Sequence, residues 1–251
     1  MSSMIFGIRP VMEAAESGKE FERVIIQSHL TSPLAKDLQH LLRKLDIPVQ
    51  YAPVEKLNRL TRKNHQGVVA MVSEITYHKV ENLLPPLYEQ GTAPLLVMLD
   101  EVTDVRNLGA ITRTAECAGA HAVIVPRKGS AQINAETMKA SSGALNILPV
   151  CREESLENTL RFLKTGGLQA IACTEKAPET YSAADFTLPT VLVLGSEGKG
   201  ISPGLLNLCD RQVSIPLLGK IASLNVSVSA GIILYEAVRQ RSESGSVKRG
   251  A

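Results

Sequence analysis

Apolar positions in the C-terminal part of the chain form short, nearly continuous runs that alternate with helical patterns. The runs cover Leu95–Leu99, Ala122–Val125, Ala170–Ala172, Val191–Leu194 and Val213–Ile215. A parallel strand that is buried on both faces is apolar at almost every position, whereas a half-exposed strand alternates. The pattern therefore predicts an α/β fold with a parallel sheet covered on both faces, in a domain spanning residues 94–243.

The first 75 residues predict a smaller α/β domain, because short apolar runs there are separated by amphipathic helical patterns. Strands are expected at Arg23–Gln27, Pro48–Tyr51 and Val68–Val72, and helices at Pro10–Ala15, Leu34–Leu45 and Val54–Leu60. Residues 76–93 contain Pro85, Pro86 and Gly91 without a sustained period, which indicates a linker with room for a helical turn. Residues 244–251 are expected to form a flexible tail.

Composition limits the class of protein. A chain of 251 residues with 44% hydrophobic content can bury a sizeable core. The net charge is only +2, so a nucleic-acid partner would have to be bound by basic residues gathered locally. The four cysteines form no C-x-x-C pair, which favours buried thiols in a reducing compartment over a zinc site or disulfides. We expect a cytoplasmic protein, because no secretory signal or membrane-spanning run is found.

Three polar, glycine-rich segments follow apolar runs at the points where a strand should give way to a helix. They span Leu99–Ala115, Leu194–Ser202 and Ile215–Glu236. In open α/β sheets, ligands bind just beyond the carboxyl ends of the strands. Three such segments in one domain therefore predict a ligand site.

Each segment carries candidate chemistry beside a plain structural alternative. In the first, Asn107 is expected to cap the following helix, and Arg113 lies off the buried stripe of that helix. The second, G-S-E-G-K-G, matches neither the phosphate loop of NTPases nor a dinucleotide loop, and offers Glu197 as a carboxylate. In the third, a cap by Ser223 or Asn225 explains only one of several polar positions. The structural alternative is a solvated arginine for the first segment, a tight turn for the second and a simple helix cap for the third.

The chain resembles the SpoU/TrmH family of the SPOUT superfamily over about residues 94–240. The motifs that match, in family order, are D-x-V-x-D-x-x-N-L-G-A-x-x-R-T-A, L-G-S-E-G-x-G and I-P-x-x-G-x-x-x-S-L-N-V-S-V. The family comprises S-adenosylmethionine-dependent RNA ribose 2′-O-methyltransferases. The N-terminal block, with Gly7–Val11 and His65–Val69, looks like a ribosomal-L30e-like substrate-binding domain. The two blocks together are similar to members that methylate a guanosine of bacterial 23S rRNA.

The resemblance implies a C-terminal trefoil knot, a homodimer, S-adenosylmethionine as cofactor, and no metal. It implies a polar catalytic group formed by Asn107, Arg113, Glu197, Ser223 and Asn225. The cofactor-binding positions that it implies are Leu194, Gly195, Gly200, Ile215, Leu217 and Leu224. Where the family usually has proline, this chain has Val105, which is expected to loosen the loop before Asn107.

Basic residues that could contact RNA gather in the N-terminal domain. The expected contacts are Arg9, Lys56, Arg59, Arg62, Lys63 and His65. Contacts to phosphates set position more than sequence choice, and a solvated helix face is the alternative for each residue taken alone. Base stacking on a sheet is not expected, because aromatic residues make up only 4% of the chain.

Two questions stay open at the level of sequence. The ribose hydroxyl must lose its proton, and either Arg113, acting through phosphate or water, or Glu197 could serve that step. The substrate could be 23S rRNA, as naked RNA or during large-subunit assembly, or another rRNA position or tRNA. An RNA-binding assembly factor without catalysis is the alternative from a different class.

Overall fold

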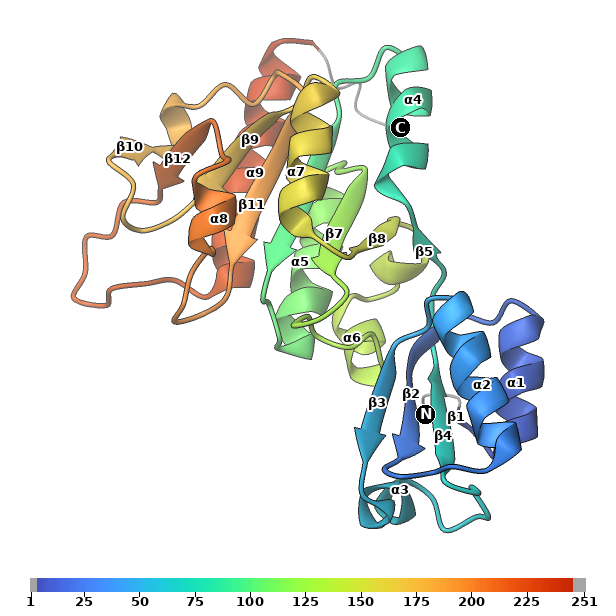
Figure 1. The fold of residues 1–251 in the computed structure, drawn as a ribbon. Helices are drawn as coiled ribbons and strands as arrows, with labels where there is room; N and C mark the ends of the chain where they lie inside the picture. Colours follow the sequence, from blue (N-terminus) through green and yellow to red (C-terminus); the bar gives the residue numbers. More distant parts are fainter. Residues whose placement is uncertain (1–3, 246–251) are drawn as a thin grey trace. The chain divides into compact units, whose positions relative to one another are not determined.

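The computed structural model describes residues 4–245, which form two compact units. The first unit contains the residues up to Thr76 together with Ile133–Ala135, and the second contains Tyr77–Gln132 and the residues from Glu136 onward. Figure 1 shows the elements of both units along the chain. No helix among the described residues is long and apolar enough to cross a membrane.

A four-stranded sheet forms the centre of the first unit, in the order β1-β4-β2-β3. Its strands are β1 (Met4–Phe6), β2 (Phe21–Gln27), β3 (Val49–Ala52) and β4 (Val68–Val72). Its helices are α1 (Ile8–Glu16), α2 (Pro33–Lys44) and α3 (Val54–Leu60). Helices α1 and α2 pack on one face of the sheet, and α3 packs on the other. The strands and helices expected in this block are confirmed.

The second unit is built on an eight-stranded sheet in which every pairing is parallel, in the order β10-β12-β9-β11-β6-β7-β8-β5. Its strands are β5 (Tyr77–His78), β6 (Leu95–Asp100), β7 (Ala122–Pro126), β8 (Val150–Glu153), β9 (Gln169–Cys173), β10 (Glu179–Thr180), β11 (Thr190–Gly195) and β12 (Arg211–Ser214). Leu194 of β11 is in register with Leu99 of β6 and with Cys173 of β9. The polar segments after these strands therefore start at one edge of the sheet.

Helices cover both faces of this sheet, as the apolar runs predict. The helices that follow β5 along the chain are α4 (Val80–Glu89), α5 (Val105–Cys117), α6 (Ala135–Ala140), α7 (Leu156–Thr165), α8 (Pro203–Leu206) and α9 (Val226–Glu243). Two short 3₁₀ turns lie at Ala144–Asn146 and Tyr181–Ala183. Helices α4, α7 and α8 share a core on one face. Helices α5 and α9 pack against each other on the other face (Figure 1).

Residues 76–93 are folded more extensively than the expected linker. They contain β5, which pairs with β8, and α4, which holds Pro85 and Pro86 inside the helix. The prolines remove two backbone donors, and burial of Val80 and Leu84 in the core offsets that loss. The tail expected at 244–251 lies largely outside the described residues, because α9 ends at Glu243 and the description ends at residue 245.

A buried arginine holds the end of α9 in place. Arg241 is 7% exposed, and its guanidinium donates hydrogen bonds to four backbone carbonyls. The acceptors are the carbonyl oxygens of Ala93, Pro94, Phe186 and Leu188. Burial lowers the pKa of this guanidinium. These acceptors lie just before β6 and β11. Arg241 therefore fixes the end of α9 against the two strands that precede the first two glycine-rich segments.

The cysteines only partly match the expectation of buried thiols. Cys151 is buried, Cys173 and Cys209 are half-buried, and Cys117 is exposed on α5. Burial raises the pKa of the first three thiols to about 12, so they stay protonated at neutral pH.

Candidate functional site

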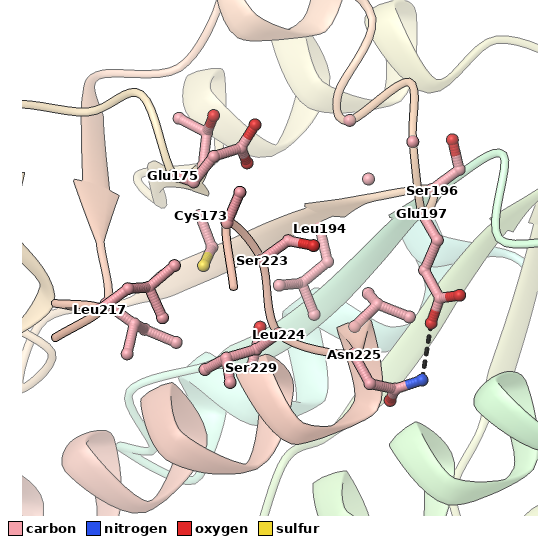
Figure 2. Close-up of a pocket in the computed structure, with 17 residues that line it drawn as sticks. Cys173, Glu175, Leu194, Ser196, Glu197, Leu217, Ser223, Leu224, Asn225 and Ser229 are labelled. Atoms are coloured by element: carbon pink, nitrogen blue, oxygen red, sulfur yellow. Dashed lines mark hydrogen bonds between the residues drawn. The ribbon is translucent and has the colours of Figure 1, made fainter. Parts of the chain in front are cut away.

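A cavity of about 540 Å³ lies where β9 and β11 end (Figure 2). Its wall comes from those two strand ends, from the glycine loop after β11, and from the segment that leads into α9. All six positions expected to bind the cofactor line it, namely Leu194, Gly195, Gly200, Ile215, Leu217 and Leu224. Sites for small molecules commonly enclose about 300–1,000 Å³ with apolar walls and a few polar groups, and this cavity has that character.

Three polar side chains from three different segments meet beside this cavity, and we call them the amide–carboxylate cluster. Asn225 Nδ2 donates to Glu197 Oε1 at 2.6 Å and to Asn107 Oδ1 at 3.0 Å. Asn107 Nδ2 donates to the same Glu197 oxygen at 3.0 Å. Figure 2 shows the contact between Asn225 and Glu197 at one side of the cavity. The carboxylate is therefore oriented by two neutral amides, and neither of them neutralises its charge.

Asp104, rather than Asn107, caps helix α5. Its Oδ1 accepts from the backbone N–H of Arg106 at 2.7 Å and of Asn107 at 3.3 Å. The side-chain hydrogen bond from Arg106, helped by these backbone bonds, lowers the pKa of Asp104. Because the cap comes from Asp104, the Asn107 side chain can reach Glu197 instead. Val105 is the first residue of the helix, so the loop that was expected to loosen is already helical there.

The residue before helix α9 serves two purposes. The Asn225 Oδ1 accepts from the backbone N–H of Ser227 at 2.9 Å and from its hydroxyl at 2.6 Å, while Nδ2 makes the cluster bonds. Of the two cap candidates, the structure therefore selects Asn225. Ser223 and Ser229 line the cavity instead.

The glycine loop after β11 is closed on itself. A Cβ atom added at Gly195 would lie 2.1 Å from the carbonyl carbon of Gly200, and Ser196 pairs with Gly200 in an isolated bridge. The loop is thus a tight turn closed by the chain's own backbone. Asp100 Oδ2 also accepts from the Ser202 N–H at 2.7 Å, which ties the loop's far end to β6. The tight closure fixes the position from which Glu197 projects.

Arg113 is not brought to the cluster. It lies on an exposed face of α5, and it does not line the cavity. Within residues 4–245 its side chain makes no hydrogen bond or ion pair. Of the five residues expected to form the catalytic group, Asn107, Glu197 and Asn225 contact one another within one chain. Ser223 lies in the cavity wall, and Arg113 lies at the surface.

The basic residues expected to contact RNA differ in accessibility. Five are exposed on the first unit, namely Arg9, Lys56, Arg59, Arg62 and Lys63. Lys63 lies over the ring of Phe6, 5.3 Å from its centroid. His65 is 8% exposed: its Nδ1 accepts from the Gly67 N–H at 3.0 Å, and its Nε2 lies 2.8 Å from Asn58 Oδ1. Both ring nitrogens are used inside the domain, so His65 shapes the loop before β4 instead of facing a ligand.

Sequence reasoning missed two acidic residues at this edge. Asp104 is not among the caps expected from the sequence, although aspartate is a preferred cap residue. Glu175 lines the cavity two residues after β9 ends, and the apolar run at Ala170–Ala172 gave the signal for that strand end. No group of three or more His, Cys, Asp or Glu side chains among the described residues is arranged to hold a metal ion.

Comparison with known proteins gives matches over both units. Residues 94–235 match the SpoU rRNA Methylase family, and residues 4–78 match the RNA 2′-O ribose methyltransferase substrate binding family. The chain is 38% identical to the 23S rRNA (guanosine-2′-O-)-methyltransferase RlmB of Escherichia coli, over 96% of this chain and 100% of that protein.

Solved structures are similar as well. The SpoU methyltransferase AviRb of Streptomyces viridochromogenes, in complex with AdoMet, aligns with a TM-score of 0.61 and 29% identity, over 96% of this chain and 90% of that one. The TrmH/SpoU tRNA modifying enzyme of A. aeolicus aligns with a TM-score of 0.57 and 33% identity, over 66% of this chain and 86% of that one.

Proposed function

Because the chain belongs to the SpoU rRNA methylase family, we propose that it methylates the ribose 2′-hydroxyl of a guanosine in 23S rRNA. The chain is an RNA methyltransferase, and S-adenosylmethionine is its methyl donor. The choice of guanosine and of 23S rRNA is supported by the E. coli relative, which is similar over nearly its whole length. The structural observation that carries the proposal is the amide–carboxylate cluster beside a cavity of cofactor size.

The cavity fits the methyl donor in its chemistry. Leu194, Ile215, Leu217 and Leu224 offer apolar surface for a nucleoside, and Ser223 offers a hydroxyl. These residues, with the backbone at Gly195 and Gly200, would hold the donor. When bound, S-adenosylmethionine supplies a methyl group on a positively charged sulfur.

Glu197 is the base that the geometry favours. The 2′-hydroxyl must give up its proton as the methyl group is transferred, and a carboxylate can accept that proton. Two amide donors hold Glu197 Oε1 in place, from Asn107 and Asn225. A guanidinium stays protonated in proteins, so we assign Arg113 to an RNA phosphate, where a planar fork of donors binds well.

We propose a homodimer in which one subunit completes the site of the other. Val228 and Tyr235 lie on one face of α9, away from its buried residues, and are 49% and 53% exposed. Thr114, next to Arg113 on α5, packs against Gly231 of this helix. Arg113 therefore adjoins an apolar face that a second copy could cover, which would bring it to the partner's RNA. The trefoil knot also remains a prediction from the family resemblance.

The first unit would deliver the RNA. Its exposed lysines and arginines suit phosphates, and the match to a substrate-binding family supports this role. We assign the contacts to Arg9, Lys56, Arg59, Arg62 and Lys63, and leave His65 as a support of the loop. The cytoplasm is the proposed location, and assembly of the large ribosomal subunit is the proposed occasion.

Methyl transfer from labelled S-adenosylmethionine to purified RNA tests the proposal. The protein should label 23S rRNA, and nuclease digestion should release the label as 2′-O-methylguanosine. Label on tRNA or on a different nucleotide would redirect the substrate while keeping the chemistry. RNA binding without any label would favour an assembly factor. Sedimentation equilibrium separately tests the dimer, because a fully active monomer of 27.0 kDa would contradict the shared site.

A further inference from the structure

The cavity wall carries an unbalanced charge. Among the described residues that line the cavity, Glu175 and Glu197 are the charged ones, and no lysine or arginine joins them. The two carboxylates come from different strand ends, Glu175 after β9 and Glu197 after β11, and they lie on opposite sides of the cavity in Figure 2. A ligand between them meets negative charge from both sides.

The nearest cations along the chain do not line the cavity. Lys176 and Lys220 adjoin the lining segments without lining the cavity. Lys199 sits in the glycine loop, but its Nζ is 3.0 Å from Glu101 Oε2 and is paired there. The partners of Glu197 inside the cluster are neutral amides.

The charge of Glu175 also reaches the cavity wall. Cys173 lines the cavity, and burial raises the pKa of its thiol to about 12, with the Glu175 carboxylate as a second cause. The thiol is therefore neutral, and it adds no charge of its own to the wall. Glu197 is the proposed base in the amide–carboxylate cluster, and Glu175 has no role in that proton transfer.

We propose that Glu175, together with Glu197, makes the cavity discriminate by charge between the methyl donor and the spent product. The inference rests on the proposed function, since it takes S-adenosylmethionine as the occupant. The donor carries a sulfonium, an ammonium and a carboxylate, for a net charge of +1. After transfer the electron pair of the broken carbon–sulfur bond stays on sulfur, so S-adenosylhomocysteine has a net charge of zero. A negative cavity binds the first more strongly than the second, and so favours release of product after each turnover.

Calorimetric titration of the full-length protein tests this with three probes: S-adenosylmethionine, S-adenosylhomocysteine, and sinefungin, which carries an ammonium in place of the sulfonium. Glu175→Gln should weaken the two cationic probes by about fivefold and the neutral product by less than twofold, as expected for one lost charge–charge interaction. Glu175→Lys should lower the ratio of donor to product affinity further. Glu89→Gln, an equal charge change on the exposed surface of α4, should leave all three affinities unchanged.

Added salt gives a second measurement that needs no variant. The donor-to-product affinity ratio of the unaltered protein should fall as ionic strength rises, because Glu175 is exposed to solvent. Equal weakening of all three probes by Glu175→Gln would mean a hydrogen bond to a shared group and would overturn the charge proposal. An unchanged, salt-independent ratio would overturn it too. Failure of the unaltered protein to bind any probe would instead count against the proposed function.

Discussion

Asn225 Nδ2 donates to Glu197 Oε1 across 2.6 Å, and this bond ties the N-cap of α9 to the glycine loop after β11. The other end of the same amide caps α9 through the Ser227 N–H. One side chain thus couples the start of a helix to the orientation of the proposed base. Its two ends can be separated by substitution.

Asn225→Ser should keep the helix cap and lose the bond to Glu197, because serine caps helices well but has no amide to donate. We expect the free energy of unfolding to change by less than about 0.5 kcal/mol, and methyl transfer to fall by about 100-fold or more. Asn225→Ala should lose both functions and also destabilise the protein by about 1 kcal/mol. Denaturant unfolding and single-turnover kinetics measure the two effects. Normal transfer in the serine variant would remove the amide–carboxylate cluster from the mechanism.

Arg113→Ala should abolish methyl transfer and leave donor affinity nearly unchanged, since Arg113 lies outside the cavity lining. Arg113→Lys should also fail, because a point charge does not reproduce a planar fork of donors. Calorimetry with S-adenosylmethionine and a transfer assay check the two halves. Recovery of most activity by lysine would favour simple charge neutralisation.

Mixed dimers extend that test. Coexpressed Arg113→Ala and Asn225→Ser subunits should regain part of the activity if each site takes Arg113 from one chain and Asn225 from the other. Mixtures as inactive as either variant alone would argue that both residues act within one chain.

Val105→Pro should stabilise the protein by about 0.4–1 kcal/mol, because proline suits the first position of a helix and restricts the unfolded chain. Asp104 before it has φ −80° and ψ 124°, which a following proline tolerates. No bond to the Val105 N–H is lost within the described residues. Thermal unfolding measures the gain, and a lower unfolding temperature would contradict this account of the α5 start.

Arg241→Met should destabilise the protein by roughly 2–4 kcal/mol, because four backbone carbonyls lose a donor, and of these, within the described residues, only the carbonyls of Pro94 and Leu188 also accept a hydrogen bond from Thr190. Arg161→Met is the matched control on the surface of α7, where its pair with Glu157 is solvent-exposed and should contribute less than about 0.5 kcal/mol. Denaturant unfolding compares the two. Equal effects would mean that the carbonyls find other partners.

A chain that begins at Tyr77 should bind S-adenosylmethionine with an affinity near that of the full protein, because the cavity lies wholly in the second unit. A chain that begins at Pro94 lacks Val80 and Leu84, exposes part of the core, and should unfold at a lower temperature. Calorimetry and thermal unfolding of both chains test the division of labour. Loss of binding in the longer one would contradict it.

The cofactor positions come from the family resemblance and remain a prediction, but the strands could be predicted from the sequence for a physical reason. Strands buried on both faces leave nearly continuous apolar runs, and the residues after them must meet at one edge of a parallel sheet. The sequence did not identify the cap of α5, because two residues near the helix start are chemically able to cap it. Asp104 and Asn107 can both cap a helix, and only the backbone path shows that Asp104 does so.

Side-chain environment and accessibility were also out of reach of the sequence. His65 sits among lysines and arginines along the chain, yet its ring is turned inward between Asn58 and Gly67. The prolines of residues 76–93 predicted irregular chain, and the burial of Val80 and Leu84, which depends on the distant residues of α7, favours a helix instead.

The most direct test of the central claim is mass mapping of 2′-O-methyl groups on rRNA and tRNA from cells with and without this protein. We predict that one 2′-O-methylguanosine of 23S rRNA disappears with the gene, returns with the unaltered chain, and does not return with Asn225→Ser. A complete set of 23S rRNA methyl groups in the absence of the protein would contradict the account.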